Sequence, residues 1–225
     1  MSLVRLRSLP LVSLRGVNPG LRRTLASASL PTTCPACSKP LPTRLPICPS
    51  CSHISSLPTN TPYQTLFNLP ENTFQIDLKD LRNRFLQTQR IMHPDAWSSK
   101  PEKEKAAAAE YSSLLNKAYE TLRSPLKRAE YLLSLRDIEL GERDKLEDVE
   151  FIHDVMELRE EVEFAETVQE VEAVMERNRA GINNALSSFE QAYNRGDYEA
   201  AKEACVKLKY WVGVEESAQA KLREM

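Results

Sequence analysis

Apolar residues recur every three or four positions over most of the chain from residue 62 onward, the pattern of amphipathic helices. Asp77 can cap a first long helix that runs to about Met92, and a second helix begins near Pro101 and continues to about residue 123. Pro94 must end the first helix, because the residue before a proline is disfavoured in the α region. The inward positions expected on the first helix are Leu78, Leu81, Phe85, Thr88 and Ile91, and those on the second are Ala107, Tyr111, Leu114, Leu115, Ala118 and Leu122. We expect the two helices to pack antiparallel as a hairpin.

Three further helices are expected after residue 145. The first has an apolar stripe at helical spacing, formed by Phe151, Val155, Leu158, Val162 and Ala165. A second helix runs from about Thr167 to Asn194, with Gly196 as its cap, and a third runs from Tyr198 nearly to the end. The core positions expected on the third are Ala201, Cys205, Leu208, Trp211 or Val212, and Leu222, with Val206 and Val214 widening this core. Short connections predict an antiparallel three-helix bundle over residues 145–225, so the fold class is all-α.

Charge is distributed unevenly, although the formal net charge is only −2. Residues 1–70 contain seven Lys and Arg and no acid, whereas residues 136–225 carry 12 basic and 23 acidic side chains. This acidic excess would repel nucleic-acid phosphates and disfavours nucleic-acid binding as the function. No apolar run approaches the ~20 residues that cross a bilayer, so we expect no membrane span.

The first 30 residues are rich in Arg, Ser and Leu and contain no acid, which is typical of a mitochondrial transit peptide. A secretory signal fits less well because Arg residues interrupt every apolar run; a disordered basic arm is the alternative. We expect cleavage between Arg23 and Pro31 and a location in the mitochondrial matrix.

The segment of residues 31–55 contains two C-x-x-C pairs, formed by Cys34 with Cys37 and by Cys48 with Cys51. Such pairs supply four thiolates for one tetrahedral zinc ion, and so short a segment needs a metal or disulfide in place of a core. Two disulfides or a redox pair are the alternatives, and a reducing matrix disfavours both. His53 is a less favoured ligand. With four protein ligands, the zinc would be structural and not catalytic.

The loop between the first two predicted helices contains His93, Pro94 and Asp95. A general base needs a nucleophile or a substrate pocket, and the tip of a helical hairpin supplies neither. The sequence has no G-x-S-x-G or other nucleophile signature, and one His with one Asp across a proline is a poor metal site. We therefore expect the chain not to be an enzyme.

A helix, an exposed His-Pro-Asp loop and a long second helix resemble the J-domain, the module that activates DnaK-class chaperone ATPases. The J-domain is expected over residues 62–135, with the segment YQTLFNLP as its short first helix. The resemblance implies that His93, Pro94 and Asp95 contact the chaperone. It also implies that basic residues of the preceding helix meet an acidic surface there, the candidates being Arg82, Arg84 and Arg90. Ala96 departs from the family, which usually has a basic residue after the loop.

The segments SPLKRAEYLLSLRDIEL and FIHDVMELREEVE resemble the HscB-type co-chaperones, J-proteins devoted to iron–sulfur cluster biogenesis. In that family the first segment leads into a three-helix domain that holds the cluster scaffold protein. Arg136 and Asp137 replace a glycine often found there. The resemblance implies two partners, an iron–sulfur scaffold protein and a mitochondrial DnaK-class chaperone.

Three apolar residues lie off the core stripes of the C-terminal helices, namely Ile152, Met156 and Tyr210. They either widen the core or form an exposed apolar patch. The resemblance implies a patch, because these positions match those that grip the scaffold, with leucines usual in place of Ile152 and Met156. Acids beside the patch would form a rim for a basic partner, and Glu157 and Glu161 are the candidates.

The interpretation is a co-chaperone that binds the scaffold, delivers it to the chaperone and stimulates the chaperone's ATPase. A general J-protein for mitochondrial folding or import is the first alternative, since it shares the J-domain and needs no patch. A zinc-ribbon regulator that binds nucleic acid through Lys39 and Arg44 is the second. Cys205 lies on a core stripe and is interpreted as a packing residue, not a cluster ligand.

Overall fold

The structure is a computed structural model that describes residues 32–41, 47–48, 50–55, 61–141 and 148–225. The helices are α1 (Tyr63–Leu66), α2 (Leu78–Met92), the 3-10 helix η1 (Pro94–Trp97), α3 (Glu102–Arg123), α4 (Pro125–Ser134), α5 (Val149–Phe164), α6 (Val168–Arg195) and α7 (Tyr198–Glu224). Extended pairing among the described residues is limited to two isolated bridges near the cysteines. The all-α prediction is confirmed. The expected transit peptide and Arg44 lie outside the described residues.

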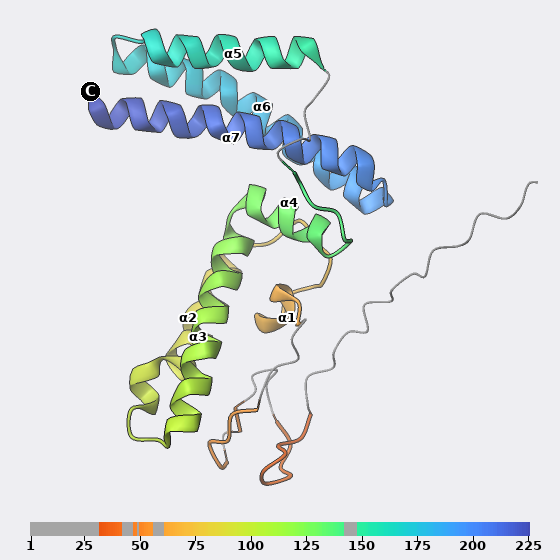
Figure 1. Ribbon diagram of the computed structural model, residues 1–225, viewed down its shortest axis with the longest axis vertical. Helices are drawn as coiled ribbons and strands as arrows, with labels where there is room; N and C mark the ends of the chain where they lie inside the picture. Colours follow the sequence, from red (N-terminus) through yellow and green to blue (C-terminus); the bar gives the residue numbers. More distant parts are fainter. Residues whose placement is uncertain (1–31, 42–46, 49, 56–60, 142–147) are drawn as a thin grey trace, which may run out of the picture.

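The helices form two parts set at a steep angle to each other (Figure 1). The α2–α3 hairpin projects from a bundle in which α5, α6 and α7 lie side by side, and α4 lies between the two parts. Local sequence explains both long hairpin helices. The Asp77 carboxylate accepts from the N–H groups of Lys79 and Asp80 at the start of α2, and Pro101 stands immediately before α3.

The hairpin core differs from the expected stripe at the ends of α2. Leu81, Thr88 and Met92 are buried, whereas Leu78 and Ile91 are 49% and 44% exposed, so the prediction that these two face inward was wrong. The reason is geometric: the buried line passes from Thr88 to Met92, four residues on, and Ile91 lies about 100° away from Met92 around the helix. On α3 the expected core residues are buried or half-buried, with Ala108 more buried than Ala107.

The C-terminal bundle agrees with the sequence pattern. The four stripe residues on α5 and Ala165 immediately after it are buried, as are Val206 and Val214 on α7. A reciprocal capping box between Thr167 and Glu170 starts α6, and Gly196, at φ +75°, ends it in the left-handed conformation. Cys205 is fully buried, which confirms its place in the core.

Candidate partner surfaces and metal centre

The His-Pro-Asp loop forms the tip of the hairpin, between α2 and α3. The side chains of His93 and Asp95 are 59% and 92% exposed. His93 has extended backbone angles and ends α2 because Pro94 follows it. Its Nδ1 accepts from the Asp95 N–H (3.3 Å) and lies 3.5 Å from Oδ2 of Asp95. The two polar side chains therefore lie together and open to solvent, as a surface contacted by another protein requires.

Trp97 holds this tip in shape, a role not predicted from the sequence. It ends the 3-10 helix η1, is 5% exposed and packs in the hairpin core. Its indole N–H donates to the Ile91 carbonyl (2.9 Å), one of the last carbonyls of α2. An aromatic residue three positions after the proline of a short polar loop was the available sequence signal.

The three predicted steering cations on α2 have different surroundings. Arg82 and Arg90 are exposed. Arg84 donates through Nε to Asp80 (2.9 Å) and through Nη1 to the carbonyls of Phe67 (3.2 Å) and Asn68 (2.9 Å). It therefore ties α2 to the segment after α1, and Asp80 compensates its charge. Arg82 and Arg90 are the better placed of the three to meet a partner.

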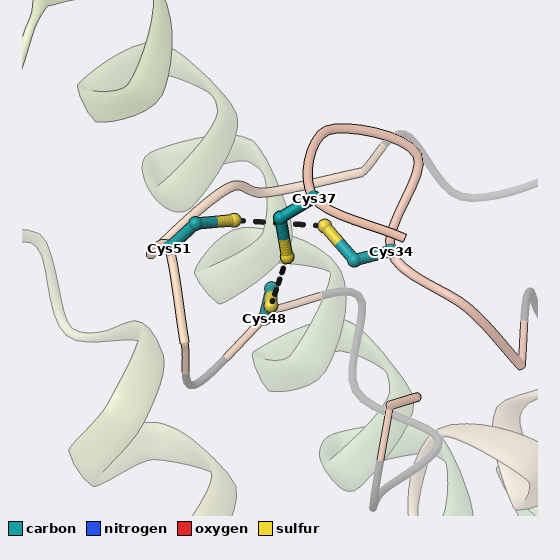
Figure 2. A group of neighbouring side chains, drawn as sticks. All are labelled: Cys34, Cys37, Cys48 and Cys51. Atoms are coloured by element: carbon teal, nitrogen blue, oxygen red, sulfur yellow. Dashed lines mark hydrogen bonds between the residues drawn. The ribbon is translucent and has the colours of Figure 1, made fainter. Parts of the chain in front are cut away.

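The four predicted metal ligands meet at one point (Figure 2). The Sγ atoms of Cys34, Cys37, Cys48 and Cys51 all lie within 4.8 Å of one another, and His53 does not belong to this group. The Cys34–Cys51 and Cys37–Cys48 sulfur distances are 3.6 Å and 3.5 Å. A disulfide would need about 2.05 Å, so the thiols are free and the two-disulfide alternative is wrong. Sulfurs bound to one zinc at ~2.3 Å lie about 3.8 Å apart at tetrahedral corners, so the arrangement fits a metal site.

Two turns of the same construction hold the four sulfurs. In the first, the Cys34 N–H donates to Lys39 and the Ser38 N–H donates to Cys34, both at 2.8 Å. In the second, Cys48 donates to His53 and Ser52 donates to Cys48, both at 2.9 Å. Ser38 and Ser52 share a left-handed φ of 58° and 59°. The repeated C-P-x-C-S pattern was a sequence signal for this symmetry.

The electrostatics of the cluster favour a bound cation. Burial tends to raise the pKa of Cys48, but hydrogen bonds from the N–H groups of Cys51 and Ser50 and from the thiols of Cys37 and Cys51 together outweigh it and lower the pKa to about 6. The His53 N–H tends to lower the pKa of Cys51, yet burial and the neighbouring thiols raise it to about 12. Four sulfurs this close cannot all ionise unless a cation offsets their mutual repulsion. The donor set therefore suits a divalent metal held by four thiolates.

The cysteine segment packs on the helical hairpin side of the molecule. Ile54, 9% exposed, belongs to the same apolar core as Leu66, Phe67 and Leu69, and Ile47 packs against that core. These two isoleucines also pair with each other through a β-bridge. The cysteine segment thus contributes side chains to the hairpin's core and is not a separate appendage.

The predicted patch lies where the start of α5 meets the middle of α7. Ile152 and Tyr210 are half-buried at the edge of the bundle core, whereas Met156 is 56% exposed. The Tyr210 ring packs edge-on against Phe151, with centroids 5.9 Å apart. Ile152 and Met156 lie one turn apart on α5. Ile152 and Tyr210 therefore widen the bundle core in part, whereas Met156 is open to solvent as an exposed patch would require.

The two candidate rim acids differ in their partners. Glu157 is exposed on α5. Glu161 accepts from Nη1 of Arg177 on α6 (3.0 Å) and also pairs with Nη2 of the same side chain. Arg177 therefore compensates the Glu161 charge within the bundle, and Glu157 is the better placed to meet a basic partner.

The chain resembles known proteins over most of its length. It is 35% identical over 169 residues to the iron–sulfur cluster co-chaperone protein HscB of Mus musculus, a match covering 74% of this chain and 72% of that protein. It is 33% identical over 178 residues to the Homo sapiens protein of that name, covering 77% and 74%. The crystal structure of human co-chaperone protein HscB matches with a TM-score of 0.76 at 31% identity, covering 86% of this chain and 100% of that chain. The chain belongs to the HscB family of co-chaperones.

The HscB assignment extends to the C-terminal bundle. Residues 147–219 match the family model described as the HSCB C-terminal oligomerisation domain, and all predicted scaffold-binding positions fall within this range. Chaperone HscB from Vibrio cholerae matches with a TM-score of 0.65 at 30% identity, covering 72% of this chain and 98% of that chain. The HscB-type resemblance is thereby confirmed. None of the described helices is long and apolar enough to cross a membrane.

Proposed function

We propose that this HscB-family chain binds an iron–sulfur cluster scaffold protein and presents it to a mitochondrial DnaK-class chaperone, whose ATPase it stimulates. The observation that carries the proposal is the placement of two exposed surfaces on separate parts of one packed molecule. His93 and Asp95 form one, at the hairpin tip. Met156, bordered by half-buried Ile152 and Tyr210, forms the other, on the bundle. The chain itself hydrolyses nothing; the reaction belongs to the chaperone.

The hairpin, with the J-domain assigned to residues 62–135, is the chaperone-binding part. The loop of His93, Pro94 and Asp95 contacts the chaperone's ATPase domain, and exposed Arg82 and Arg90 steer the association. Such charges act mainly on the rate of association and on its salt dependence. Because one molecule holds both partners, the scaffold reaches the chaperone at a raised effective concentration without any new contact between them.

The four-cysteine segment holds one zinc ion in a structural role. Bound zinc would cross-link the two C-x-x-C turns, and four protein ligands leave no open position for catalysis. Because Ile54 packs in the hairpin core, ordering of the cysteine turns by zinc would also stabilise the chaperone-binding part. The basic, acid-free residues 1–30 support import into the mitochondrial matrix.

Scaffold binding distinguishes this proposal from a general J-protein. The variant Ile152→Ala/Met156→Ala/Tyr210→Ala should bind purified scaffold protein at least about tenfold more weakly by isothermal titration calorimetry, because it removes apolar contact area from one patch. Phe164→Ala is the matched control, since Phe164 is on the same helix and is 75% exposed, yet lies outside the patch. Unchanged affinity in the triple variant would instead favour the general J-protein.

A further inference from the structure

A buried arginine lies at the junction of the two parts. Arg128, on α4, is only 5% exposed. Its Nε donates to the Leu122 carbonyl in the last turn of α3 (2.7 Å), and its Nη1 donates to the Phe74 carbonyl in the segment between α1 and α2 (2.7 Å). The guanidinium carbon also lies 5.3 Å from the centre of the Phe74 ring. One side chain therefore ties together three segments on the hairpin side of the molecule.

Phe74 carries this connection into the bundle. Its ring lies 4.8 Å from that of Phe189 on α6, and both rings are buried. The next residue, Gln75, donates through Nε2 to the carboxylate of Glu190 (2.6 Å). These contacts join the segment before α2 to a helix more than a hundred residues later in the chain. The segment of Phe74 and Gln75, which Arg128 contacts, therefore packs directly against α6 of the bundle.

We propose that Arg128 is a positioning residue that holds the Phe74 segment against α6 and so sets the angle between the hairpin and the C-terminal bundle. The proposal rests on the proposed function, because the angle matters only if the hairpin tip and the bundle patch serve two partners at once. Arg128 touches neither surface. Its effect is on the distance and orientation between them.

The site requires the hydrogen-bonding guanidinium of an arginine, and a side chain of similar size without these donors would not replace it. A cation buried here costs desolvation energy, which lowers the pKa of the Arg128 guanidinium. Its bonds go to two backbone carbonyls, and the Leu122 carbonyl lies at the negative end of the α3 dipole. The planar fork reaches both carbonyls while its face covers the Phe74 ring, which a lysine ammonium cannot do. An apolar replacement would fill the space but leave both carbonyls without this donor.

Residual dipolar couplings on the full chain test the angle directly. In the wild-type chain the hairpin and the bundle should share one alignment tensor. In Arg128→Met and Arg128→Lys each part should keep its own internal couplings, but the two tensors should differ. Arg123→Met is the matched control, because Arg123 is a nearby cation that is 56% exposed, and the partners that the described residues give it, Glu120 and the Tyr119 ring, lie on its own helix; it should keep a single tensor.

The functional readout separates positioning from stability. With Arg128→Met, chaperone ATPase stimulation without scaffold and scaffold affinity should each stay at the wild-type level, while the extra stimulation produced by adding scaffold should fall about three- to tenfold. A single shared tensor in folded Arg128→Met would overturn the proposal. If neither Arg128 variant folds, Phe74→Leu takes their place, and a single tensor in that variant overturns the proposal equally. If the wild-type chain shows no scaffold-dependent gain, the proposed function fails, and the couplings still decide the role of Arg128.

Discussion

The substitution Ile54→Ala tests whether the cysteine segment stabilises the α2–α3 hairpin. Ile54 follows the second C-x-x-C pair, is 9% exposed and shares a core with residues of α1, α2 and α3. If the metal segment were an independent appendage, truncating this side chain would disturb only the segment itself. Because it packs in the hairpin core, the hairpin should lose stability as well.

The expected loss follows from the burial of this side chain. Truncating a buried isoleucine to alanine in a core costs about 2–5 kcal/mol. Ile54 lies at the edge of the core, where it keeps 9% of its surface exposed, so we take the lower end, about 2–3 kcal/mol. A change of that size lowers the equilibrium constant for closing the hairpin roughly 30- to 150-fold, at about 1.4 kcal/mol for each factor of ten.

Native-state amide hydrogen exchange measures this locally. In Ile54→Ala the protection of Leu115, at the centre of α3, should fall by that factor, while Val171 on α6 should lose much less. Leu78→Ala is the control, since it removes an apolar side chain that is 49% exposed on α2. Unchanged protection of Leu115 would refute the view that the metal segment belongs to the hairpin core.

Further outcomes are expected for the metal, for two glycines and for Asp148. The purified chain should contain one zinc per molecule by mass spectrometry, and chelation should lower the protection of α3 as Ile54→Ala does; absence of zinc, or disulfide-bonded cysteines, would contradict the metal assignment. Gly181→Ala should cost about 1–3 kcal/mol in denaturant unfolding, because its Cβ would lie 2.5 Å from Cε2 of Trp211. Gly196→Ala has open space but a φ of +75°, so it should cost about 1 kcal/mol through backbone strain alone. If Gly181→Ala is as stable as the wild type, the steric explanation is wrong, and if Gly196→Ala is as stable, the backbone-strain explanation is wrong. The Phe151 N–H and Lys207 lower the pKa of Asp148, so its stabilising effect is present above the unfolded pKa of about 3.9 and is lost as the pH falls through the lower folded pKa. Thermal unfolding of Asp148→Asn should therefore depend less on pH below about 4 than that of the wild type, and equal dependence would contradict this.

Local sequence signals were sufficient for the long helices of the hairpin and the bundle, whereas α4 and η1 were not among the helices expected from the sequence. Asp77 caps α2 as expected, and α6 begins after Thr167 and ends at Gly196, near the expected positions, because caps and periodicity act over a few neighbouring residues. The wrong predictions, Leu78 and Ile91, lie at the two ends of the apolar stripe of α2. The pattern alone could not show that the buried line of α2 runs to Met92 and leaves Ile91 exposed, because that depends on what packs against the last turn.

Contacts between distant segments could not be predicted in this way. The four cysteines were found by spacing, but nothing near them indicates that Ile54 enters the hairpin core. The pairing of Glu161 with Arg177 joins two helices whose facing positions only the tertiary structure reveals. Arg128 stands in a segment singled out by its resemblance to HscB-type co-chaperones, yet its partners lie up to 54 residues away.

The central proposal, that this chain activates a chaperone through its exposed hairpin tip, is tested most directly by the ATPase rate of a DnaK-class chaperone. The rate is measured with wild-type chain and with His93→Gln, each with and without the scaffold protein. We predict that the wild-type chain stimulates hydrolysis and that scaffold increases the effect, while His93→Gln keeps its helical circular dichroism and gives no stimulation. Equal stimulation by His93→Gln and the wild-type chain would contradict the proposal.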